Sequence, residues 1–306
     1  MFQFSSKSSL PFTLLTAVLL GSTLVVSRFS LGQFPTQTYV AMRLAAGSLC
    51  FLVAYFVFRV RPWPRRGGLW IRAGIFGLFG TALTMTAFTQ SVSYQSSGVT
   101  ALLATLSPIE TALLAHLFLK DERFCWWHMV GAAFAFFGAG FLLLKGENGL
   151  ATLAQADWRG YAWALLGTLT NSIGLVYARR YLRDEDSFVV TSIRILVGAA
   201  TILLVTGLTT GIDLSQVQAS GVLALLYAGA AGTFLAFLLY MTTVQRFGAT
   251  AASQTEYYVP LVAAGLGALL LGEVVTGNML FGMVLILLGL VIFDRGGRIA
   301  ARLRER

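Results

Sequence analysis

Charged residues are scarce in this sequence. They make up 11% of its 306 residues, whereas a soluble domain carries roughly 25%. So few charges cannot cover a water-exposed surface, and hydrophobic residues supply 57% of the chain. Lipid is therefore the solvent in which most of the chain is expected to remain exposed. The composition predicts an integral membrane protein and excludes an ordinary soluble domain.

Residues and motifs that bind metals, nucleotides or reactive groups are also rare. The two cysteines, Cys50 and Cys125, have no CxxC or other metal-binding spacing, and the two histidines, His116 and His128, have no nearby cluster of metal ligands. The GxxxxGK[ST] pattern of ATP-driven proteins is absent, as are GxSxG and HExxH. We therefore expect no metal site, no cofactor, no catalytic residues and no enzymatic activity.

Long apolar stretches fill the rest of the chain. A helix of about 20 residues crosses a hydrocarbon core roughly 30 Å thick. Backbone groups find no water partner in lipid, and the alternating pattern of barrel strands is absent, so each stretch is expected to be an α-helix. Ten spans are predicted, at residues 10–30, 36–58, 70–91, 97–119, 125–144, 159–179, 187–208, 219–244, 249–271 and 276–294.

Lysine and arginine are distributed unevenly between the two sides of these spans. With a cytoplasmic N-terminus, 17 of the 22 lie in inner segments and three in outer segments, while Arg43 and Arg194 lie within spans. Positive residues favour the cytoplasmic side, so both termini are predicted to be cytoplasmic. A nucleic-acid partner is not expected, because these residues flank spans instead of clustering on a soluble face.

The two halves of the chain match each other at an offset of 150–152 residues. We expect a first five-helix repeat at 1–147, a linker at 148–158, and a second repeat at 159–306 with a basic cytoplasmic tail. Because five is odd, the second repeat would enter the membrane inverted, an arrangement that lets one site face either side. Three of the matching pairs are Arg43 with Arg194, Pro108 with Pro260, and Glu122 with Glu273.

The same residues carry a resemblance to a known family. The segment from Tyr258-Val259-Pro260 to Leu271-Gly272-Glu273 is similar to the second half of EamA-type transporters of the drug/metabolite transporter superfamily. One departure is the LKDER sequence at 119–123, where the family tends to have LGE. The resemblance implies two five-helix repeats in a bacterial inner-membrane carrier. It implies transport of amino acids or other small metabolites without identifying the cargo.

Four ionisable residues lie inside the expected spans, where a charge costs roughly 2.5–3.5 kcal/mol near the bilayer centre. We interpret Glu110 and Glu256 as acids that line a central cavity and bind a substrate ammonium or a coupling proton; structural salt bridges are the alternative. Arg43 and Arg194 are interpreted as ties between helices, with contact to a substrate carboxylate or phosphate as the alternative. If Arg43 pairs with Glu110, or Arg194 with Glu256, the acid is not free to titrate near neutral pH.

Other polar residues in the spans are further candidates for substrate binding, with interhelical hydrogen bonding as the alternative role. They are Gln254, Tyr257, Asn171, Thr86 and Gln90. Pro108 and Pro260 interrupt backbone hydrogen bonding within spans, which predicts either a hinge for gating or a static bend.

Together these features predict a secondary active transporter. It would export a small metabolite, an amino acid or a similar polar or amphipathic compound, across the bacterial inner membrane by alternating access. The alternatives are a membrane enzyme and a non-transporting receptor with the same helical bundle. The expected partners are the small-molecule substrate and the lipid bilayer. A proton is the candidate coupling ion, and a second copy of the chain is a candidate partner.

Overall fold

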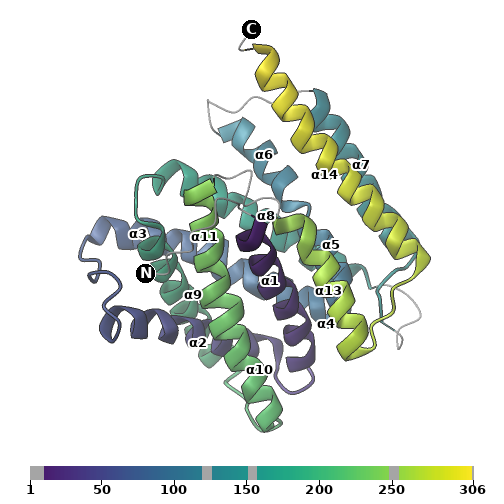
Figure 1. Ribbon diagram of the computed structural model, residues 1–306. Helices are drawn as coiled ribbons and strands as arrows, with labels where there is room; N and C mark the ends of the chain where they lie inside the picture. Colours follow the sequence, from purple (N-terminus) through teal and green to yellow (C-terminus); the bar gives the residue numbers. More distant parts are fainter. Residues whose placement is uncertain (1–9, 119–125, 151–156, 248–254, 305–306) are drawn as a thin grey trace.

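The computed structural model describes residues 10–118, 126–150, 157–247 and 255–304, and every regular element in these ranges is helical (Figure 1). The first half contains α1 (Leu10–Ser30), α2 (Thr36–Phe56), α3 (Gly67–Gly77), η1 (Leu78–Leu83), α4 (Thr84–Tyr94), α5 (Ser97–Ala104), α6 (Ser107–Phe118) and α7 (Trp126–Leu144). The second contains α8 (Trp158–Tyr181), α9 (Ser187–Thr209), α10 (Ala219–Gly229), η2 (Ala230–Leu235), α11 (Ala236–Phe247), α13 (Thr255–Leu271) and α14 (Gly277–Arg304).

Most of these helices can cross a membrane. Within the described ranges, seven helical stretches are both long enough and apolar enough to do so, and two shorter apolar helices lie at Thr255–Leu271 and Gly277–Phe293. The 24-residue α8 occupies the sixth expected span but is not among the seven, because polar residues interrupt it at Thr168, Thr170, Asn171 and Ser172. The all-helical, multi-pass membrane protein is confirmed, whereas the count of ten crossings stays a prediction.

Two of the expected spans contain a π-helical segment in the middle. η1 separates α3 from α4, and η2 separates α10 from α11. The two segments occupy equivalent places in the halves, 152 residues apart. π-Helical turns are rare and occur often at functional sites. Hydropathy cannot reveal them, because one extra residue in a turn does not alter an apolar run.

The two prolines of the spans differ in their effect. α5 ends at Ala104 and α6 begins at Ser107, so the fourth expected span is divided just before Pro108. Proline is tolerated in the first turn of a helix, where its missing N–H has no intrahelical partner in any case. Pro260 instead lies inside α13, which continues through it.

The halves pack against each other and do not form separate bundles. α1 packs mainly on α13, α2 on α9, α4 on α8, and α7 on α14, so each pair joins the first half to the second. Figure 1 shows α7 and α14 running side by side along one edge. Their approach depends on small residues: a Cβ at Gly131 would come 2.5 Å from the Gly289 carbonyl oxygen, and one at Gly289 would come 2.6 Å from the Gly131 carbonyl oxygen.

A buried carboxylate fixes the start of α5 against the second half. Glu273 accepts hydrogen bonds from the Ser97 backbone N–H at 2.8 Å and hydroxyl at 2.7 Å, and from the Gly98 N–H at 3.4 Å. The negative charge also complements the positive end of the helix dipole. Glu273 therefore caps α5, whereas Glu122, its counterpart in the repeat, lies outside the described residues.

Candidate substrate-binding cavity

A cavity of about 170 Å³ lies among α1, α2, α4, α5, α6, α8, α9, α11 and α13. Both halves of the chain therefore contribute to its walls. Most of the lining is apolar, and it includes Leu24, Met85, Phe88 and Val259. Polar and charged side chains also reach it, and a mostly apolar hollow with polar groups is typical of a small-molecule site.

Three charged residues line this cavity in the described part of the chain: Arg43, Arg194 and Glu256. The ion pairs between described residues are Arg61 with Asp186 at 3.2 Å and Arg66 with Glu185 at 3.7 Å, both of them away from the cavity. The structure therefore shows neither of the two arginine–glutamate pairs considered from the sequence.

Arg43 is held by hydrogen bonds to two other helical elements. Its Nε donates to the Thr233 hydroxyl in η2 at 3.1 Å, and its guanidinium donates to the Ser27 hydroxyl in α1 at 3.4 Å. The side chain is only 6% exposed. Arg43 thus joins α2 to both halves of the bundle.

Arg194 has a different environment. Its guanidinium carbon lies 4.7 Å from the ring centroid of Phe76 in α3 and 4.5 Å from that of Phe237 in α11. These are cation–π contacts. The side chain is 3% exposed, and its Nε has no hydrogen-bond partner in the part of the chain that the structure describes.

Glu256 lies in the first turn of α13, half-buried, with its side chain at the cavity wall. Tyr240 of α11 lines the same cavity and lies close enough to interact electrostatically with both Glu256 and Arg194. An acid and a base thus face one small, mostly apolar space without forming an ion pair with each other.

Glu110 does not belong to the lining of this cavity. It lies between α6 and α8, where its Oε1 accepts a hydrogen bond from the Thr168 hydroxyl at 2.9 Å. Its Oε2 is buried without a partner among the described residues. The two glutamates predicted to line a central cavity are therefore placed in different surroundings.

The structure brings some of the other predicted binding residues to the cavity and leaves others apart. Asn171 lines it and donates to the Ser107 hydroxyl at 2.9 Å. Thr86 donates to the Ala82 carbonyl of its own helix at 2.8 Å, and Gln90 is likewise absent from the lining. The Tyr257 hydroxyl donates to the Leu290 carbonyl of α14 at 3.3 Å. Gln254 lies outside the described residues, and the binding roles of all five stay predictions.

The prolines are adjacent to lining residues. Pro108 follows Ser107, and Pro260 follows Val259. Sequence reasoning missed Phe237, Tyr240 and Met241, which line the cavity from one face of α11. Their spacing of three and four residues is the signal that could have found them.

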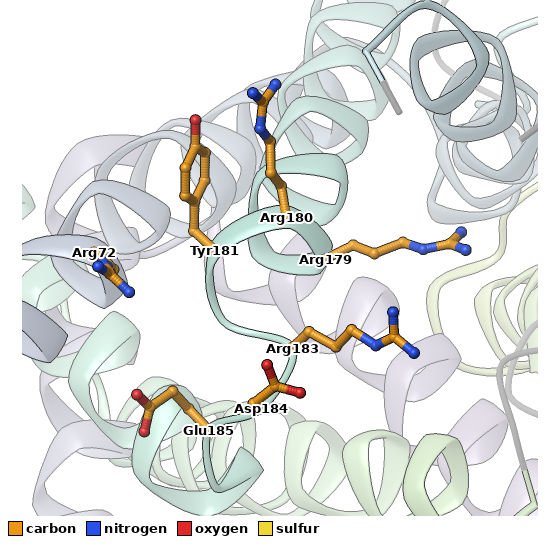
Figure 2. Close-up of a pocket in the computed structure, with 7 residues that line it drawn as sticks. All are labelled: Arg72, Arg179, Arg180, Tyr181, Arg183, Asp184 and Glu185. Atoms are coloured by element: carbon orange, nitrogen blue, oxygen red, sulfur yellow. The ribbon is translucent and has the colours of Figure 1, made fainter. Parts of the chain in front are cut away.

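A second hollow, of about 430 Å³, lies at the ends of the third and sixth expected spans (Figure 2). Arg179 and Arg180 from the end of α8, Arg183 from the following loop, and Arg72 from α3 surround it. Figure 2 shows their side chains pointing in several directions, with Asp184 and Glu185 among them. The four arginines are exposed and fall in segments predicted to be cytoplasmic, so they fit a role in orienting the chain in the membrane.

Comparison with known protein families identifies the family of this chain. A model of the EamA-like transporter family matches the chain twice, at residues 7–144 and 158–293. The chain belongs to this family. The two matches coincide with the halves recognised from the internal repeat, and the resemblance noted in the sequence is confirmed.

Several curated relatives align over most of the chain. The uncharacterized inner membrane transporter YedA of Escherichia coli K12 is 28% identical over 290 residues, which cover 90% of this chain and 89% of YedA. A WAT1-related chloroplastic protein of Arabidopsis thaliana is 26% identical over 270 residues, covering 84% of this chain. The aligned region is 62% of the plant protein, so the chain spans less than two thirds of that relative.

The fold also occurs in a solved crystal structure. That chain is 20% identical to this one and superposes with a TM-score of 0.67, covering 96% of this chain and 99% of its own. At this identity, the likeness shows a shared fold alone.

Proposed function

We propose that this chain is a secondary active transporter that moves a small metabolite across the membrane by alternating access. The observation that carries the proposal is the cavity between the two halves, which is mostly apolar and contains buried charged groups. Charged side chains within a membrane bundle commonly mark a substrate or ion pathway. The membership of a transporter family supports the same interpretation.

The architecture proposed is ten crossings in two inverted repeats. Equivalent elements of the two halves support it. A Cβ at Gly77 would come 2.5 Å from the Arg194 carbonyl oxygen, and one at Gly229 would come 3.2 Å from the Arg43 carbonyl oxygen. Gly77 directly precedes η1, and Gly229 directly precedes η2. A close helix contact of the same kind therefore adjoins the π-helical segment in each half.

The orientation proposed places both termini in the cytoplasm of a bacterium, with the chain in the inner membrane. The distribution of Lys and Arg supports the orientation, and the name of the E. coli relative supports the compartment. The cargo proposed is an amino acid or a similar small polar or amphipathic compound that is exported. Glu256 is the first candidate to couple this movement to a proton, because it faces the cavity.

Flux through purified protein tests the proposal. The chain would be reconstituted in proteoliposomes loaded with unlabelled amino acids, and exchange with an external ¹⁴C-labelled amino-acid mixture would be measured. We expect exchange above that of empty liposomes, and loss of its dependence on a pH gradient in Glu256→Gln. Glu185→Gln, which removes a partly exposed carboxylate away from the cavity, is the matched control.

Two results would overturn parts of this proposal. Folded wild-type protein that gives no exchange above empty liposomes would overturn amino acids as the cargo. Gradient-dependent exchange that is unchanged in Glu256→Gln and in Glu110→Gln would remove both acids from coupling.

A further inference from the structure

The two arginines at equivalent positions of the halves differ in how their donors are used. Arg43 donates to Thr233 and Ser27. Arg194 is at least as deeply buried, yet it forms no hydrogen bond or ion pair with any residue in the described ranges. A buried cation normally has both a charge partner and hydrogen-bond acceptors, so the Arg194 guanidinium is incomplete as it stands.

The internal repeat shows which partner Arg194 would have if the halves were identical. Gly80-Thr81 matches Gly232-Thr233, and the Thr233 hydroxyl is the acceptor for Arg43. The Thr81 hydroxyl is buried and has no partner among the described residues. Arg194 is therefore not held by the hydroxyl that its repeat position provides, and both members of the equivalent pair are unsatisfied.

Aromatic rings position the Arg194 guanidinium without using its donors. The faces of Phe76 and Phe237 contact it at 4.7 and 4.5 Å from the ring centroids. A ring face attracts the positive charge but offers no acceptor to the planar fork of N–H groups. That fork matches a carboxylate, which it can bind through two parallel hydrogen bonds.

We infer that Arg194 binds a carboxylate of the transported compound, which makes the cargo a small amphipathic carboxylate. The inference rests on the proposed function and deepens it by naming the chemical group that the cavity recognises. A carboxylate suits the site better than a phosphate dianion, because Arg43, Arg194 and Glu256 together bring one net positive charge to the lining of this cavity of about 170 Å³, which a single carboxylate neutralises. Glu256 receives the ammonium group when the compound has one.

Binding to the purified chain tests this without any measurement of flux. The probes share one apolar part and differ only in polar groups: 4-methylpentanoate, leucine, 3-methylbutylamine and 3-methylbutanol. Each would be added in excess at equal concentration, and the shift in thermal unfolding midpoint recorded, because a ligand that binds the native state raises it. We expect 4-methylpentanoate and leucine to raise the midpoint, and the amine and the alcohol to leave it unchanged.

Variants then assign the effect to Arg194. Arg194→Gln should weaken the apparent affinity for 4-methylpentanoate at least tenfold. Arg194→Lys keeps the positive charge but loses the planar pair of N–H donors, so its affinity should lie between those of Arg194→Gln and the wild type. Arg180→Gln, at an exposed arginine outside the cavity, is the control and should bind as the wild type does. Glu256→Gln should remove any advantage of leucine over 4-methylpentanoate.

The outcomes separate this inference from the proposed function. If the amine raised the unfolding midpoint of the wild-type protein as much as the carboxylate does, the role of Arg194 would be overturned. This test needs no variant, so it holds even if a variant fails to fold. Unchanged carboxylate affinity in Arg194→Gln would overturn that role too. Carboxylate binding through Arg194 with no flux in proteoliposomes would instead overturn transport while leaving the binding site intact.

Discussion

The contrast between Thr233 and Thr81 yields a prediction about stability. Valine has nearly the shape of threonine but replaces the hydroxyl with a methyl group. Thr233→Val would remove the acceptor for the Arg43 Nε and the donor to the Ala228 carbonyl, which lies 2.9 Å away. Thr233 is fully buried, so neither group at this position is open to bulk water. The buried Arg43 would lose one of its two hydrogen bonds.

The size of the loss follows from these contacts. A hydrogen bond to a charged group contributes about 1.5–3 kcal/mol in soluble proteins. Hydrogen bonds between membrane helices average about 0.6 kcal/mol and reach about 1.7 kcal/mol. Because Thr233 serves a buried charge, we expect Thr233→Val to lower the free energy of unfolding by about 1–2 kcal/mol, near the upper end of the membrane range.

Thr81→Val is the matched control, because the Thr81 hydroxyl has no partner among the described residues. Removing an unsatisfied buried hydroxyl should leave stability unchanged or raise it. Both variants would be unfolded in mixed micelles by titration with SDS and by heat, with a midpoint lower by about 2–4 °C per kcal/mol as a guide. Equal losses in the two variants, or no loss in Thr233→Val, would refute the reasoning from the Arg43 contact.

Three other predictions concern packing and topology. Glu273→Gln should lower the free energy of unfolding by about 1–2 kcal/mol, because an amide cannot accept all the donors at Ser97 and Gly98; an unchanged SDS midpoint would contradict the cap. Gly131→Ala should destabilise the protein by about 1–3 kcal/mol, because the added Cβ would clash with α14. Gly140→Ala is the control: its Cβ would have no atom within 4 Å, so the substitution should stabilise the helix by up to about 1 kcal/mol. Thermal midpoints that fall equally in the two variants would contradict this difference. Reporter enzymes fused to the two ends should both report the cytoplasm, and ends on opposite sides would exclude an even number of crossings.

The helices were predictable because lipid imposes a strict condition on the backbone. An apolar run of about 20 residues must satisfy its own hydrogen bonds, and helix is the solution available to it. The predicted spans therefore match the observed helices closely, as at Leu10–Ser30 and residues 187–208 against Ser187–Thr209. The π-helical segments were not predictable, because they depend on how α3 and α10 pack against their neighbours and not on apolarity.

The candidate site was only partly predictable. The cost of burying charge singled out four residues, and three of them, Arg43, Arg194 and Glu256, line the cavity. Glu110 and Glu256 come from the fourth and ninth expected spans, which are equivalent helices of the two halves, and both were expected at the cavity. Glu110 is instead bonded to Thr168 and lies outside the lining. Successive residues of a helix point about 100° apart, so the rotation of each helix decides what its side chains face.

The sequence by itself determined that this chain is an all-helical membrane protein with an internal repeat, because apolar length and the scarcity of charge leave few alternatives in lipid. It also supplied the motifs that place the chain in its family. Only the tertiary structure decided that Arg43 is tied to Thr233 while Arg194 lies against two aromatic rings and has no hydrogen bond to a described residue. Two equivalent positions acquire different partners because each half packs against a different set of side chains, and that asymmetry cannot be deduced from either half alone.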